Sequence, residues 1–207
     1  MNDMDSRSLI FSKIRHATSA LKAKSPLPEH DAALTHSLPR LDGTDLREMF
    51  RRNFHAVNGK AMSSVEDLAE FLKSTGHLHG CCDPSLMDAV GATLAAAGLT
   101  VETAYDRARC DDFQFGITRG TGAIAESGTI ILDDDRTFSR LAALTPWVHV
   151  AVIRRDEIHR TIPDAIAALG NSPNVVWCTG PSKTADVEGI LIEGVHGPGE
   201  QIALLLD

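Results

Sequence analysis

The residues best suited to chemistry lie near the end of the chain, after the apolar run 175–178. They combine hydroxyls, carboxylates and one ammonium group: Gly180, Ser182, Lys183, Thr184, Asp186 and Glu188. A Gly-Pro turn leading into a helix start at Ser182 would present backbone N–H groups that suit a phosphate or carboxylate. The alternative is that Ser182, Thr184 or Asp186 merely caps the helix. The segment is not a P-loop, because the required glycines are missing.

A second polar motif follows closely, with His196 between glycines in the segment 194–198. Imidazole titrates near neutral pH, so beside a carboxylate His196 could act as an acid, a base or a group that orients a ligand. The alternative is a histidine whose ring nitrogens tie the loop to neighbouring backbone.

Glu126 is the best single catalytic candidate, in the small-residue segment 119–129. A carboxylate among Ala, Ile and Gly at a sheet edge would be partly desolvated, which suits proton transfer or nucleophilic attack. The alternative is a structural carboxylate that accepts backbone N–H bonds in a turn. The Gly-x-Gly pattern here lacks the third glycine of a dinucleotide site.

Two further clusters carry metal-type ligands, at His77–Asp83 and at Asp133–Asp135. Neither spacing fits a familiar site, so we predict no metal and interpret Asp83 as a helix cap. The four cysteines include no C-x-x-C pair. We therefore expect neither a disulfide framework nor an iron–sulfur cluster in this chain, and no cofactor.

Composition limits the classes of protein that the chain can represent. Its 207 residues carry 20 basic and 28 acidic side chains, a formal net charge of -8, which argues against nucleic acid as a partner. No apolar run approaches the roughly 20 residues of a membrane span, and the N-terminus lacks the pattern of a secretory signal. We expect a cytoplasmic protein.

Helix signals divide the chain into an arm and one domain. Residues 5–24 could form a short amphipathic helix, followed by an extended connector over 25–44 that is rich in proline. Asp45, Ser64 and Asp83 each precede an apolar pattern with helical spacing, the last of these helices ending at Gly98. We predict domain boundaries of 1–44 and 45–207.

Short apolar segments interleave with helical patterns from residue 99 onward. The predicted strands are 99–105, 113–118, 129–132, 149–153, 175–178 and 201–206, with helical spacing over 138–144 and 156–169. This alternation predicts an α/β fold with a mainly parallel sheet covered on both faces. Open sheets of this kind bind ligands at the carboxyl ends of their strands, which is where we expect the polar motifs.

The C-terminal motifs, together with Ala123–Thr129 and Pro146–Val150, closely resemble the LUD domain of the lactate utilization protein C family. The resemblance covers about residues 46–207. It implies a three-layer α/β/α fold like that of ribose-phosphate isomerases and CoA-transferases. It also implies a system that oxidises L-lactate to pyruvate with cysteine-rich iron–sulfur partner proteins. The family's polar positions fall on Glu126, Arg140, His149, Ser182, Thr184, Asp186, Glu188 and His196.

Two hypotheses of function follow. In the first, the chain is an assisting subunit of the lactate-oxidising system that binds a small carboxylate or phosphate ligand or provides a docking surface. In the second, it is an enzyme in its own right, with Glu126 as base or nucleophile and His196 orienting the substrate. Ser182, Lys183 and Thr184 would then hold a phosphate, carboxylate or CoA group.

Overall fold

The chain divides into two compact units, residues 1–37 and 38–207. The computed structural model describes residues 5–19, 45–170, 172, 174–185 and 190–207. In the first unit these residues form α1 (Ser6–Ser19), a helix without a buried side chain. The rest of the predicted helix over 5–24, the connector over 25–44 and the predicted boundary after residue 44 lie outside the described residues.

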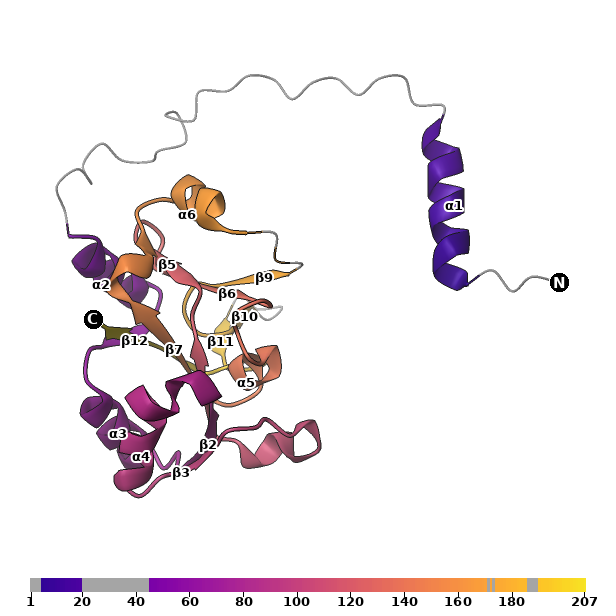
Figure 1. The fold of residues 1–207 in the computed structure, drawn as a ribbon. Coiled ribbons are helices and arrows are strands. Elements are labelled where there is room, and N and C mark those ends of the chain that lie inside the picture. The colour runs from indigo at the N-terminus through magenta and orange to yellow at the C-terminus, as the bar shows by residue number, and fades with distance from the viewer. Residues whose placement is uncertain (1–4, 20–44, 171, 173, 186–189) are drawn as a thin grey trace. The chain divides into compact units, whose positions relative to one another are not determined.

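A six-stranded, wholly parallel sheet forms the centre of the second unit (Figure 1). Its strand order is β1-β12-β7-β4-β2-β3. The strands are β1 (Lys60–Met62), β2 (His79–Cys82), β3 (Thr100–Glu102), β4 (Phe115–Arg119), β7 (Val148–Arg154) and β12 (Glu200–Leu206). The predicted mainly parallel sheet is confirmed, and β12 and β7 pair over their whole lengths at its centre.

Side-chain caps begin the helices where the sequence predicts them. Asp45 accepts from the Arg47 N–H at the start of α2 (Leu46–Ala56), and Ser64 accepts from the Asp67 N–H at the start of α3 (Val65–Ser74). Such caps satisfy N–H groups that the helix itself leaves unpaired.

The helix predicted from Asp83 to Gly98 is present as three consecutive pieces. Asp83 caps a 3-10 turn over Pro84–Leu86, a π-helical turn follows over Met87–Gly91, and α4 covers Ala92–Ala96. Gly98, at φ 92°, ends the series, because a left-handed residue terminates a helix.

Both faces of the central sheet are buried. The alternating residues Val148, Val150 and Val152 of β7 pack with α3 and α4 on one face. Ala151 and Ile153 of β7 pack on the other face with α2, α5 (Arg140–Leu144) and strands of a second sheet. This alternation places His149 on the second face, between the two sheets.

The second sheet holds four strands in the order β8-β5-β6-β9. They are β5 (Gly122–Ile124), β6 (Thr129–Asp133), β8 (Ile158–His159) and β9 (Val175–Cys178). Two of the predicted strands, 129–132 and 175–178, thus belong here and pair antiparallel. The turn between β5 and β6 is far too short for a parallel crossover, which accounts for the antiparallel pairing of these two strands.

The helix predicted over 156–169 is shorter than expected. The 3-10 turn Arg155–Glu157 and strand β8 occupy its first part, and α6 covers only Ile162–Ala168. Thr161 and Asp164 form a capping box at the start of α6, and Pro163 lies in its first turn. Proline is tolerated there but not inside a longer helix.

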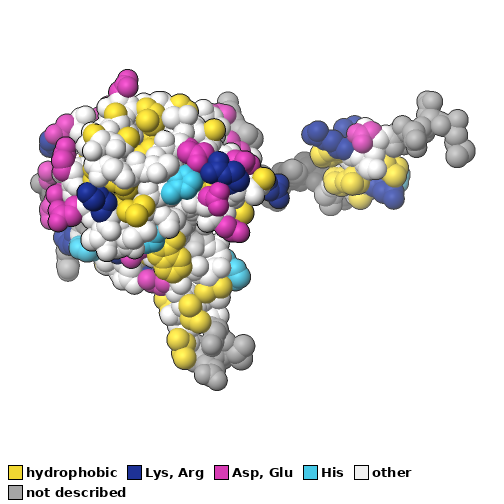
Figure 2. All heavy atoms as spheres, turned by 90° about the horizontal axis from the view of Figure 1, so that it is seen from below, with side chains coloured by type: hydrophobic (Ala, Val, Ile, Leu, Met, Phe, Trp, Pro, Cys, Tyr) yellow, Lys and Arg dark blue, Asp and Glu magenta, His cyan; other side chains and the backbone are white. Residues whose placement is uncertain are grey.

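A separate hairpin of β10 (Lys183–Ala185) and β11 (Leu191–Glu193) projects from the body of the unit (Figure 2). Its exposed side chains include the hydrophobic residues Ile190, Leu191 and Ile192.

Among the described helices, none combines the length and the apolar character that crossing a bilayer requires.

We predict that Gly116→Ala lowers the free energy of unfolding by about 1–3 kcal/mol, the usual cost of overpacking. A Cβ at this position would overlap the main-chain carbonyl of Ala142 in α5, which cannot move aside as a flexible side chain can. Urea unfolding would measure the loss. Gly170→Ala is the matched control, because a Cβ there meets no atom within 4 Å. Equal stability of the two variants would contradict the packing described.

Candidate functional site

The two C-terminal motifs, which carry Ser182 and His196, lie side by side. The Ser182 N–H donates to the Pro198 carbonyl at 2.9 Å, and the Gly194 N–H donates to the Ser182 carbonyl at 2.9 Å. A Cβ on Gly197 would lie 3.1 Å from the Ser182 Cβ, so this glycine permits the close approach. The loop that carries His196 is therefore fastened to the loop that carries Ser182.

The prediction of a helix start at Ser182 is wrong. The chain continues as strand β10, in which Thr184 is paired with Ile192 of β11. Successive N–H groups of an extended strand point in opposite directions, so they cannot converge on one anion as they do at a helix N-terminus. The alternative reading of Ser182 or Thr184 as a helix cap is wrong for the same reason. Asp186 and Glu188 lie outside the described residues.

Lys183 is held by protein atoms. Its Nζ donates to the Val57 carbonyl at 3.0 Å and lies 3.6 Å from Glu193 Oε1. Val57 is the C-cap of α2, where a cation interacts favourably with the helix dipole. A Cβ on Gly180, at φ 78°, would overlap the same carbonyl. Gly180 and Lys183 thus anchor the motif to the end of α2.

Ser182 and His196 line one cavity of about 260 Å³. Thr179, Gly180, Gly197 and Gln201 contribute further to its wall. The segment 194–198 leads into the first residue of β12, so the cavity lies at the amino end of the central sheet. Our expectation that the polar motifs lie at the carboxyl ends of the central strands is wrong, because Thr179 follows β9 of the second sheet and His196 precedes β12.

A buried hydrogen-bonded triad supports the cavity wall. Thr118 Oγ1 lies 2.9 Å from His149 Nε2, and His149 Nδ1 lies 2.8 Å from Gln201 Nε2. His149 is fully buried, and this burial lowers its pKa to about 4, although the bond to Gln201 opposes the shift. The neutral ring therefore donates through one nitrogen and accepts through the other. This network fixes the Gln201 amide beside the cavity.

Sequence reasoning selected His149 but missed Thr118 and Gln201. The available signal was polarity, since each of the two residues interrupts a run of apolar residues in its strand. A buried polar side chain requires a hydrogen-bond partner, so three such residues in neighbouring strands indicate a network.

Glu126 lies in the turn between β5 and β6. Its Oε1 accepts from the Ile162 N–H at 2.8 Å, at the first residue of α6. Asn53 donates to the Ala125 and Glu126 carbonyls, which fixes the turn to α2. These bonds match the structural role that we considered as the alternative, and the cavity wall at His196 and Ser182 does not include Glu126. Its reactive role stays a prediction.

A chain of hydroxyls connects the Glu126 turn to the cavity. Ser127 Oγ lies 2.7 Å from Thr129 Oγ1, which lies 2.8 Å from Thr179 Oγ1. Thr179 lines the cavity. Arg140, in contrast, lies at the start of α5 with its Nε 2.9 Å from Asp134 Oδ1, outside the cavity wall.

In the segment 77–83, structural roles fall to Cys81, Cys82 and Asp83. Asp83 caps the following turn, and burial raises the pKa of both Cys81 and Cys82 to about 12, so their thiols stay protonated at neutral pH. Among the residues that the structure describes, no group of three or more His, Cys, Asp or Glu side chains is placed to hold a metal ion.

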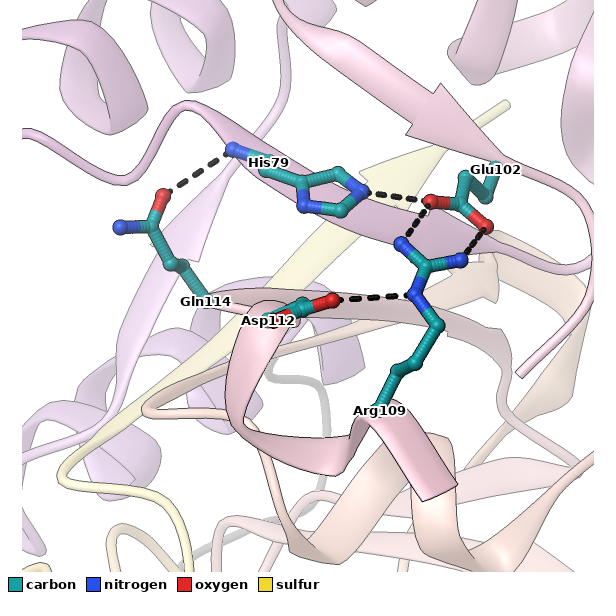
Figure 3. Close-up of polar contacts among 5 residues, drawn as sticks. All are labelled: His79, Glu102, Arg109, Asp112 and Gln114. Atoms are coloured by element: carbon teal, nitrogen blue, oxygen red, sulfur yellow. Dashed lines mark hydrogen bonds and ion pairs between the residues drawn. The ribbon is translucent and has the colours of Figure 1, made fainter. Parts of the chain in front are cut away.

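His79 belongs to an ion-pair network at the sheet edge (Figure 3). Its Nε2 lies 2.7 Å from Glu102 Oε1. Arg109 donates to both oxygens of Glu102, at 2.9 and 3.2 Å, and to Asp112 at 2.9 Å. The Arg109 bonds first, and the His79 bond second, lower the pKa of Glu102. The network fastens the 3-10 segment Arg107–Asp112 to β3.

The fold and the cavity define a class: an α/β protein with a ligand-sized cavity at the amino end of a parallel sheet. The family model of the LUD domain matches residues 87–206. Lactate utilization protein C of Deinococcus radiodurans is 32% identical over 142 residues, 66% of this chain and 67% of the relative. The chain therefore belongs to the LUD domain family.

Other relatives are matched over less of their length. Lactate utilization protein C of Macrococcus caseolyticus is 33% identical over 44% of this chain and 43% of the relative. That of Bacillus subtilis is 30% identical over 47% and 44%. The crystal structure of a DUF162 family protein from Deinococcus radiodurans, 22% identical, covers 78% of this chain and 96% of its own with a TM-score of 0.56. The similarity between this structure and our chain concerns the fold alone.

We expect His149→Gln to remove a pH-dependent part of the stability. The ordinary histidine pKa is 6.5 and the folded value is about 4, so between these values the unfolded chain binds more protons. The wild-type protein should then lose about 3 kcal/mol as pH falls from 6.5 to 4, a loss absent from the variant. Urea unfolding at both pH values measures the difference, with His16→Gln on exposed α1 as control. Parallel pH curves for wild type and variant would contradict the buried neutral ring.

Glu102→Gln should loosen the segment 107–112, because a neutral amide cannot keep both Arg109 and His79 bound. Hydrogen exchange of this segment at pH 7 should be faster in the variant than in the wild type. Since the pKa of Glu102 is lowered, its contribution is present above the ordinary value of 4.5 and is lost as pH falls below it. Glu66→Gln is the control, as Glu66 bonds only near its own helix start. Unchanged exchange in the Glu102 variant would exclude the anchoring role.

Proposed function

We propose that this chain is a ligand-binding subunit of an L-lactate utilization system. The support from relatives is their name, since proteins called lactate utilization protein C match it at 30–33% identity. The support from the structure is the convergence of Ser182 and His196 on one cavity. This convergence is the observation that carries the proposal.

The cavity suits a small hydroxy or oxo acid. Its volume of about 260 Å³ falls just under the roughly 300–1,000 Å³ typical of sites for drug-sized ligands. Ser182 offers a hydroxyl, His196 an imidazole, and Gln201 an amide held by His149. Together these groups can bind a carboxylate and a neighbouring hydroxyl or carbonyl oxygen.

The proposal assigns electron transfer to partner proteins. Oxidation of L-lactate to pyruvate releases two electrons and two protons, which require an acceptor. We propose that the acceptors are cysteine-rich iron–sulfur proteins of the same system. The four cysteines of this chain form no cluster motif, and Cys81 and Cys82 are buried in its core.

The alternative is a stand-alone enzyme of the isomerase and CoA-transferase-like fold that uses Glu126 on a phosphate-, carboxylate- or CoA-bearing substrate. The observation in its favour is the hydroxyl chain from Ser127 through Thr129 to Thr179, which joins the Glu126 turn to the cavity. The observation against it is the bond from Ile162 N–H, which already engages the Glu126 carboxylate.

Thermal unfolding with L-lactate or pyruvate tests the proposal. A ligand at 100 times its dissociation constant stabilises the folded state by about 2.7 kcal/mol, so Tm should rise with either acid. Ser182→Ala and His196→Gln should each abolish the rise, because they remove groups from the cavity wall. Ser74→Ala, which changes an exposed serine of α3, should keep it.

Growth of a deletion strain on L-lactate separates the two candidates. For a ligand-binding subunit, Glu126→Gln should restore growth as the parent chain does, while Ser182→Ala should not. Loss of growth with a folded Glu126→Gln protein would favour the enzyme. If neither acid changes Tm and the Ser182 variant still restores growth, the cavity has no role in lactate use.

A further inference from the structure

A cleft of about 640 Å³ adjoins the cavity and shares His196, Gly197 and Leu144 with it. Trp147 lines this cleft, and 49% of its surface is exposed. The volume lies within the roughly 300–1,000 Å³ of sites for ligands larger than a small acid. The cleft therefore needs an explanation separate from that of the cavity.

The Trp147 ring is held rigidly by backbone. The main-chain carbonyl of Trp147 accepts from the Glu200 N–H at 3.0 Å, and this bond ties the start of β7 to the start of β12. A Cβ on Gly194 would lie 2.6 Å from ring atoms, and one on Gly199 would also overlap the ring. The indole thus packs directly on the backbone of two glycines. A preorganised aromatic surface of this kind loses little entropy when a ligand binds.

The opposite side of the cleft is also fixed in place. Cys110 and Asp111 belong to the 3-10 segment that Arg109 fastens to Glu102, and Phe113 follows it. Phe113 packs between His79 and Tyr105, at centroid distances of 5.4 and 5.1 Å. The Arg109 network thereby holds in place the segment that contributes Cys110 and Asp111 to the cleft.

The charges of the cleft argue against an anionic ligand. No Lys or Arg is among the described residues that line it, and Asp111 contributes a carboxylate. His77 also lines it, and burial lowers the pKa of this histidine, so the ring is neutral at pH 7. The other polar side chains of the lining are those of His196, Gln114 and Thr145. The two imidazoles suit the edge of a ring with nitrogen or carbonyl groups.

We propose that this cleft binds a flat, uncharged heteroaromatic ring that stacks on the Trp147 indole and hydrogen-bonds through its edge to His77 and His196. Aromatic pairs prefer offset-stacked or edge-to-face arrangements, and base-like rings stack on exposed aromatic side chains. The site adjoins the cavity for a small acid and shares His196 with it, but the argument for it does not rest on the proposed function.

Binding of riboflavin and adenosine to the full chain tests the proposal. Calorimetry should give a dissociation constant below about 1 mM for at least one of them, and none for D-ribose, which lacks the ring. FMN, which has the same ring but carries a phosphate on the ribityl chain, should bind more weakly than riboflavin. Failure of both ring-bearing probes to bind at millimolar concentration would overturn the proposal.

Variants of Trp147 identify the stacking surface. Trp147→Leu should weaken binding at least about tenfold, whereas Trp147→Phe should keep most of it, because only Phe can stack. Trp177→Phe is the matched control, since Trp177 is also partly exposed but lines only the cavity. Equal affinity of the Leu and Phe variants would overturn the proposal. The Tm rise with L-lactate should survive in Trp147→Leu, so the two sites can fail independently.

Discussion

The parallel pairing of β12 with β7 is the interaction on which the rest of the structure depends. Its register sets Gln201 opposite His149 and runs the length of both strands. The same pairing brings the segment before β12 next to Trp147, just before β7, through the Glu200 N–H bond. Both the cavity and the cleft lie at this junction, and their walls share Leu144, His196 and Gly197.

Polar groups inside this core are tolerated because each has a partner. Among the described residues, every buried side-chain nitrogen and oxygen has a hydrogen-bond partner. His149 is an example. Burial disfavours its charged form, so the ring is neutral, and Thr118 and Gln201 provide hydrogen-bond partners for its two nitrogens. At the surface, Arg109 and His79 share the Glu102 carboxylate. Such exposed pairs contribute less to the free energy of unfolding than buried ones, because water screens the charges.

The sequence predicted the helix starts correctly where the cap is a contact between residues close in the chain. Asp45, Ser64 and Asp83 begin helices because a short polar side chain accepts from an N–H two or three residues ahead. Ser182 has the same type of side chain, but the helix predicted there is wrong because pairing with β11 makes the segment a strand. Residues 156–169 show the same limit: their helical spacing is interrupted by β8, which pairs with β5.

The sequence by itself determined the α/β class, the positions of most strands, the helix caps and the family to which the motifs point. Only the tertiary structure decided which polar residues meet. Gln201 and Thr118 join His149, Lys183 binds the end of α2, and Glu126 binds the start of α6. The physical reason is that strand order and register depend on contacts between distant segments, and these leave no periodic signal along the chain.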